Sequence, residues 1–129
     1  MFDFWSNQVL GYATRSYTTA PLDHHASALL RFTPLDSARP TLVGSNLHLS
    51  IGATEIDDLR VAPSSIEIEL SDAGAQEGSL TFYSENVLAG AGSENCQVTS
   101  VENLGDNLWK VNIAGRLWGK VQSIQLTVN

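Results

Sequence analysis

Apolar and polar residues alternate with a period of two along much of this chain. In "SSIEIELS", Ile66, Ile68 and Leu70 fall on one face, and two glutamates fall on the other. Such alternation is typical of an antiparallel strand with one face in the core and one face in water. The same pattern predicts four further strands, in "ASALLRFTP" (26–34), "NLHLSIG" (46–52), "LWKVNIAG" (108–115) and "SIQLTVN" (123–129).

The alternation also predicts which side chains of these strands point inward. The inward faces are Ala28, Leu30 and Phe32 in the first segment, Leu47, Leu49 and Ile51 in the second, Trp109, Val111 and Ile113 in the third, and Ile124, Leu126 and Val128 in the last. Turn-forming residues such as Gly, Pro, Asp and Asn separate the strands, and no apolar stripe has helical spacing over more than two turns.

About eight short strands with frequent turns predict an all-β fold, an antiparallel β-sandwich of the Greek-key or immunoglobulin-like type. We expect one domain over residues 1–129, because 129 residues suit a single core. The one soft boundary falls near residues 53–65, in "GATEIDDLRVAPSS", which is expected to join two sheets of one sandwich.

Charge and cysteine content exclude several classes of function. The net charge is -7, and the seven Lys and Arg residues form no run, which disfavours nucleic acid and anionic membrane surfaces as partners. Cys96 is the only cysteine, so no internal disulfide and no cysteine-based zinc site is expected. No apolar run approaches the ~20 residues of a membrane span, and no signal-peptide pattern is evident.

Three segments of the first half follow one another in a familiar order. They are "FDFWSNQVLG", with Phe2, Asp3, Phe4, Trp5, Leu10 and Gly11; the stretch with His25, Leu29, Leu30 and Arg31; and the stretch with Gly44, Ser45, Leu47, His48 and Gly52. Together they resemble the C-terminal β-domain of α-galactosidase-like glycoside hydrolases, a retaining clan with a (β/α)8 catalytic barrel. The resemblance covers about residues 2–56, and His24 stands where the family has Pro.

The resemblance implies a non-catalytic accessory domain that packs against a catalytic barrel and stabilises it. The family's catalytic aspartates belong to the barrel, so no catalytic residue is carried over, and this chain is expected to be a carboxy-terminal piece without enzymatic activity and without a cofactor. The residues expected to pack against the barrel are Phe2, Phe4, Trp5, His25 and His48.

The ionisable residues themselves offer no stronger chemistry. A retaining glycosidase needs two carboxyl groups about 5 to 5.5 Å apart, whereas Glu67 and Glu69 lie on the solvated face of one predicted strand. Adjacent His24 and His25 would point to opposite faces of a strand, so we expect them to hold no metal ion together.

Two alternative functions stay open. The first is a carbohydrate-binding module, in which Trp118, Tyr83 and Trp109 offer ring faces for a sugar and Trp118 lies in the loop-like "GRLWGK". Trp109 shares a face with Val111, which favours a core position. The second is a protein-interaction domain that associates with itself through an open sheet edge.

Overall fold

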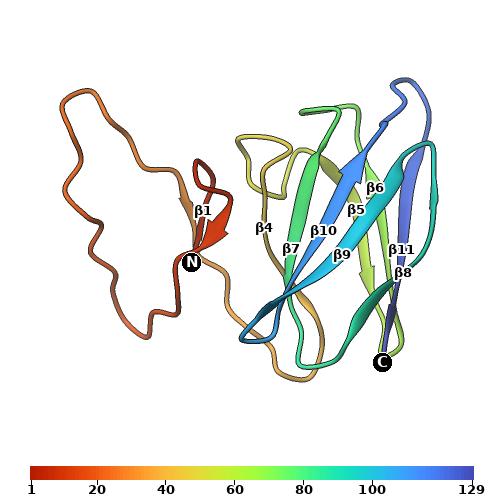
Figure 1. Cartoon of the computed structure of the whole chain (residues 1–129), viewed down its shortest axis with the longest axis horizontal. Coiled ribbons are helices and arrows are strands. Elements are labelled where there is room, and N and C mark those ends of the chain that lie inside the picture. Colours follow the sequence, from red (N-terminus) through yellow and green to blue (C-terminus); the bar gives the residue numbers. More distant parts are fainter.

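The computed structural model describes residues 1–129 and confirms the predicted antiparallel β-sandwich (Figure 1). Eight strands form two four-stranded antiparallel sheets. The first sheet has the order β4 (Thr41–Ser45), β7 (Gly78–Tyr83), β10 (Leu108–Ala114) and β9 (Gln97–Gly105). The second sheet has the order β5 (Ile56–Val61), β6 (Ser65–Leu70), β11 (Gln122–Val128) and β8 (Leu88–Glu94).

The core lies between these two sheets and uses the alternating residues that the sequence pattern assigned to it. On β6 and β11, Ile68 faces Ile124 and Ile66 faces Leu126 across the register, and all four are buried. The inward-facing residues of β7 and β10, in the other sheet, complete this core and are also shielded from water. Burial of apolar surface of this kind is the main stabilising term in folding.

A third, very small sheet lies outside the sandwich, within the segment that we call the N-terminal arm (residues 1–40). Its strands are β1 (Phe2–Asp3), β2 (Gln8–Val9) and β3 (Leu30–Arg31), with β1 in the middle. The opening "FDFWSNQV" is therefore a hairpin, with Phe4 and Trp5 in its turn. Figure 1 shows the rest of the arm looping away from the sandwich.

Few contacts attach the arm to the outer face of the first sheet. Phe2 is fully buried with its ring over Gly44 of β4. Asn7 Nδ2 donates to Ser79 Oγ at 3.0 Å. The Tyr12 hydroxyl donates to the backbone oxygen of Asp106 at 3.0 Å, and burial raises the pKa of that hydroxyl. Glycine at position 44 leaves the space that the Phe2 ring occupies.

The prediction of a strand over "NLHLSIG" is wrong, because these residues form turns and bends. Leu47 and Ile51 are buried, but Leu49 is 56% exposed. Ile51 has a φ of 54° and Gly52 a φ of 95°, which reverse the chain direction. Side chains stabilise these turns locally, as when Ser50 N donates to His48 Nδ1 at 3.0 Å. Such side-chain bonds to backbone groups compete with sheet pairing.

The strand predicted over "ASALLRFTP" is also wrong for most of its length. Only Leu30–Arg31 pairs with a neighbour, because β1 offers just two residues as a partner. Phe32, predicted to point inward, is 59% exposed. His25 has a φ of 65° and lies in a turn, so the argument that His24 and His25 point to opposite faces of a strand fails. Their ring centroids are 3.8 Å apart.

The stretch near residues 53–65 belongs to the sandwich. β5 lies within it and pairs with β6, and the preceding turns carry the chain from the first sheet to the second.

Cys96 is buried near the backbone oxygen of Ser123, and burial raises the pKa of its thiol. The chain contains no helix with the length and apolarity needed to cross a bilayer.

Candidate functional site

The N-terminal arm exposes an unusual amount of apolar surface for its length. Seven of the thirteen large apolar side chains that are exposed in this protein lie within its first forty residues. They are Trp5, Leu10, Tyr12, Tyr17, Leu22, Phe32 and Leu35. Single exposed apolar residues are normal on protein surfaces, whereas a gathering of them in one segment is typical of an interaction surface.

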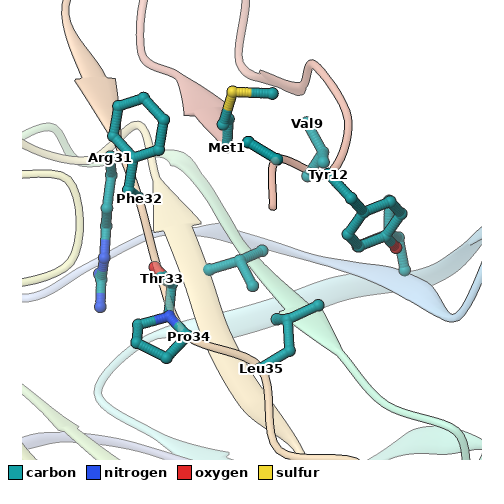
Figure 2. A pocket seen from close by; sticks show the side chains of 11 residues that line it. Met1, Val9, Tyr12, Arg31, Phe32, Thr33, Pro34 and Leu35 are labelled. Atoms are coloured by element: carbon teal, nitrogen blue, oxygen red, sulfur yellow. The ribbon is translucent and has the colours of Figure 1, made fainter. Parts of the chain in front are cut away.

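A groove of about 470 Å³ lies between the arm and the first sheet, and we call it the apolar groove (Figure 2). Val43 of β4 and Leu108 of β10 contribute from the sandwich. The arm contributes the remaining residues, which are Met1, Val9, Tyr12, Ala13, Arg31, Phe32, Thr33, Pro34 and Leu35. The hydroxyl oxygen of Thr33 is buried without a hydrogen-bond partner in the chain. Such an unpaired group costs free energy unless another molecule supplies a donor or an acceptor.

Arg31 fixes one wall of the apolar groove. Its Nη1 donates to the backbone oxygen of Ile51 at 2.6 Å, and Figure 2 shows its nitrogens lying away from Met1 and Tyr12. Burial lowers the pKa of this guanidinium, and the nearby Glu55 partly offsets that effect. The cation therefore ties the third strand of the small sheet to the turns before β5, and it leaves the groove apolar.

Glu55 is the centre of those turns and is fully buried. Its Oε1 accepts from Ser50 Oγ at 2.9 Å and from Gly52 N at 2.8 Å, while its Oε2 has no partner. His48 lies in the same turns, 2.9 Å from Ser50 Oγ through its Nδ1. The Ser50 hydroxyl donates to Glu55 and accepts from Thr54 N at 2.9 Å, so it helps to hold these turns in shape.

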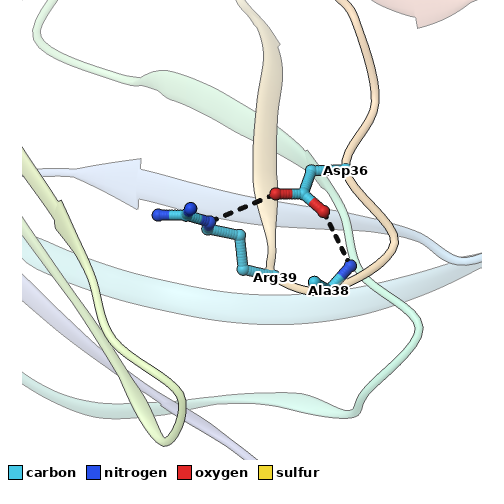
Figure 3. A network of polar contacts seen from close by, with 3 residues as sticks. All are labelled: Asp36, Ala38 and Arg39. Carbon is cyan, nitrogen blue, oxygen red and sulfur yellow. Dashed lines mark hydrogen bonds and ion pairs between the residues drawn. The ribbon is translucent and has the colours of Figure 1, made fainter.

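The connection from the arm to β4 is shaped by a polar turn (Figure 3). Asp36 Oδ1 accepts from Ala38 N at 2.8 Å, and Asp36 Oδ2 accepts from Arg39 Nε at 3.2 Å. Both charged side chains are at least half exposed, so their ion pair adds little stability. The turn instead directs the chain toward Pro40, which is buried at the start of the sandwich.

The residues expected to pack against a barrel occupy different environments. Phe2 is buried within this chain, where its ring lies over Gly44 and anchors the arm. Phe4 is half-buried and packs edge-on against Trp5, which is 58% exposed. His25 is exposed at the surface of the arm, and His48 belongs to the turns around Glu55.

The structure does not bring Trp118, Tyr83 and Trp109 together. Trp109 packs against the core and its Nε1 donates to the backbone oxygen of Ser84 at 3.2 Å. Tyr83 lies on the outer face of the sheet, edge-on to Tyr12. Trp118 follows the far end of β10 and is 43% exposed. The three rings therefore offer no common sugar-binding platform.

A buried arginine beneath Trp118 was missed by sequence reasoning, since no local pattern distinguishes it from a surface cation. Arg116 is buried with its guanidinium 4.8 Å from the centre of the Trp118 ring. Its Nε donates to Gln122 Oε1 at 2.6 Å, and its Nη1 and Nη2 donate to the backbone oxygens of Ala73, Ala75 and Ser71. It joins the β6–β7 loop to the β10–β11 loop.

The carboxylates of the second sheet form surface ion pairs. Arg60 lies 2.9 Å from Glu67 Oε2 and 3.3 Å from Asp58 Oδ2, and all three side chains are substantially exposed. No three His, Cys, Asp or Glu side chains converge closely enough to hold a metal ion.

Compared with models of protein families, with curated protein sequences and with solved structures, the chain shows no significant match.

Proposed function

We propose that this chain is a non-catalytic accessory β-sandwich domain of an α-galactosidase-like glycoside hydrolase, and that its N-terminal arm packs against the catalytic barrel. The observation that carries the proposal is the concentration of exposed apolar side chains in residues 1–40. Covering this surface with a partner would remove apolar area from water, at about 25 cal/mol for each Å². The same contact would stabilise both domains.

The choice of partner rests on where the family-like segments lie. The first two of them, around Trp5 and around Arg31, fall within the arm, next to the exposed side chains. The arm also has little sheet pairing of its own, because each of its strands has only two residues. A segment with so few internal contacts is expected to gain order when a second domain packs on it.

Self-association remains the second candidate, since the same exposed surface would suit another copy of this chain. The edge strand β5 favours it less. β5 carries Asp57, Asp58 and Arg60, and charged side chains on an edge strand discourage pairing with another sheet.

The proposal is tested by joining this chain to a retaining α-galactosidase barrel that lacks its own β-domain. The joined protein should unfold at a higher temperature than the barrel alone. Trp5→Ser combined with Phe32→Ser should abolish the gain, whereas Val87→Ser combined with Val121→Ser, which changes exposed residues outside the arm, should preserve it. Equal unfolding temperatures for all these proteins would contradict the docking role.

The non-catalytic part of the proposal has its own assay. The isolated chain should release no nitrophenol from nitrophenyl galactosides. Turnover that survives repeated purification, and that disappears on substitution of a single Asp or Glu of this chain, would show that the chain itself is an enzyme.

A further inference from the structure

A second hollow, of about 550 Å³, lies on the outer face of the first sheet, and we call it the polar groove. Its lining is dominated by amides, hydroxyls and one carboxylate, from Asn7, Asn46, Glu77, Ser79, Ser100 and Asn112. These residues come from the arm, from the end of β4, and from β7, β9 and β10. Five separate segments of the sequence therefore converge on one polar surface.

The amide of Asn46 is held in a single orientation. Its Oδ1 accepts from the backbone N–H of Ser79 at 2.7 Å. A backbone N–H can only donate, so the oxygen of this amide must face Ser79 and the assignment of its two ends is fixed. The Nδ2 group has no partner within the chain and is left as a free donor at the groove.

The amide of Asn112 is held the other way round, by its nitrogen and not by its oxygen. Its Nδ2 donates to Ser100 Oγ at 2.8 Å and to Glu102 Oε2 at 3.2 Å. An ionised carboxylate can only accept, so the nitrogen must face Glu102 and the Oδ1 is left as a free acceptor. The groove thus offers one fixed donor and one fixed acceptor, and this preorganisation lowers the entropy cost of binding a ligand.

The two amides flank the same residue of the sheet. Asn112 is the register partner of Ser79 on one side, and Asn46 bonds to Ser79 on the other. Because adjacent strands lie about 4.8 Å apart, their backbones are separated by roughly 10 Å across β7. A ligand that uses both amides must therefore carry several hydrogen-bonding groups over about the length of two sugar rings.

Charge and backbone pairing limit the class of ligand. No Lys or Arg lines the groove, and Glu77 does, in a chain whose net charge is -7, so phosphate, sulfate and carboxylate groups are disfavoured. The backbones of β7 and β10 are already paired on both sides, so these two strands offer a peptide no free hydrogen-bonding edge. What fits is a neutral molecule whose groups both donate and accept.

We infer that the polar groove binds a neutral carbohydrate, of about disaccharide length, through the Nδ2 of Asn46 and the Oδ1 of Asn112. Each sugar hydroxyl both donates and accepts a hydrogen bond, so hydroxyls of the same molecule satisfy the free donor and the free acceptor. The site is distinct from the apolar groove and from Trp118. It goes beyond the docking role and does not depend on it.

The test is a titration of the ¹⁵N-labelled chain with lactose, cellobiose and maltose, followed through the side-chain amide signals of asparagine. At least one disaccharide should shift the signals of Asn46 and Asn112 saturably. Asn46→Asp keeps the acceptor for Ser79 N and removes the free donor, so it should weaken binding about fivefold or more, the usual effect of losing one hydrogen bond.

Asn103→Asp is the matched control. Asn103 Oδ1 also accepts from a backbone N–H, that of Gly105 at 2.8 Å, but it lies outside the polar groove. This variant should bind like the unsubstituted chain. Three results would overturn the inference: no saturable shift with any of the three sugars, shifts confined to the loop around Trp118, or unchanged affinity in Asn46→Asp.

Discussion

The contact between Phe2 and Gly44 decides whether the N-terminal arm stays on the sandwich. Phe2 is the one aromatic side chain of the arm that is fully buried, and a Cβ atom at position 44 would lie only 2.2–2.5 Å from its ring carbons. The polar contacts of the arm, such as the one between Asn7 and Ser79, are partly exposed and each adds only about 1 kcal/mol. The aromatic contact therefore dominates the attachment.

Gly44→Ala should displace the Phe2 ring and loosen the arm while the two-sheet core stays folded. Limited proteolysis should then cut the arm faster than in the unsubstituted chain. Gly90→Ala is the control, because a Cβ there would meet nothing closer than 3.7 Å. If both variants are cut at the original rate, the arm is held by something other than this contact.

At the scale of elements, buried Arg116 joins two loops at one end of the sandwich. Gln122, its side-chain partner, donates from Nε2 to Asp72 Oδ1 at 3.1 Å and to the backbone oxygen of Leu117 at 2.9 Å. The β6–β7 and β10–β11 loops are thus tied through one hydrogen-bonded network. Breaking such a network destabilises the fold, since each buried group left unpaired costs about 1–3 kcal/mol.

Arg116→Met should lower the free energy of unfolding by about 3 kcal/mol or more, because it leaves three backbone oxygens and Gln122 without their donor, and each unpaired buried group costs about 1–3 kcal/mol. Arg60→Met, which removes only exposed ion pairs, should change it by less than about 1 kcal/mol. Urea denaturation of both variants measures the difference. A small effect at position 116 would mean that the loops are independent.

Three long strands, β6, β10 and β11, were predicted from the sequence, whereas the arm and the strands β4, β5, β7, β8 and β9 were not. β6, β10 and β11 each bury one face over six or seven residues, so their alternation follows directly from the core. In "NLHLSIG" the same alternation is produced by turns, in which Leu47 and Ile51 are buried by a chain reversal. A period of two cannot distinguish these cases, because the hydrogen bonds of Glu55 and Ser50 decide between them.

The candidate sites depend even more on contacts distant in sequence. The apolar groove joins Val9, Phe32 and Leu108, and the polar groove joins Asn7, Asn46 and Asn112. The exposed Trp118 was anticipated by its glycine-flanked loop, but the separation of Trp118 from Tyr83 follows from strand order. Residue types alone carry no signal for such groupings.

At the scale of the whole molecule, the protein combines a sandwich that has its own apolar core with an arm that buries little of its own apolar surface. The arm has fewer backbone hydrogen bonds than the sandwich. Of the 55 in the chain, 40 lie within regular strands, and most of the arm lies outside any strand. A docking role requires that the arm, and not the sandwich, changes when a barrel is joined to the chain.

Hydrogen–deuterium exchange read by mass spectrometry tests this most directly, on the chain alone and on the chain joined to a retaining α-galactosidase barrel. The docking account predicts that amides of residues 12–35 exchange quickly in the chain alone and become protected in the joined protein, while β6 and β11 are unchanged. Equally fast exchange of the arm in both proteins would contradict the account.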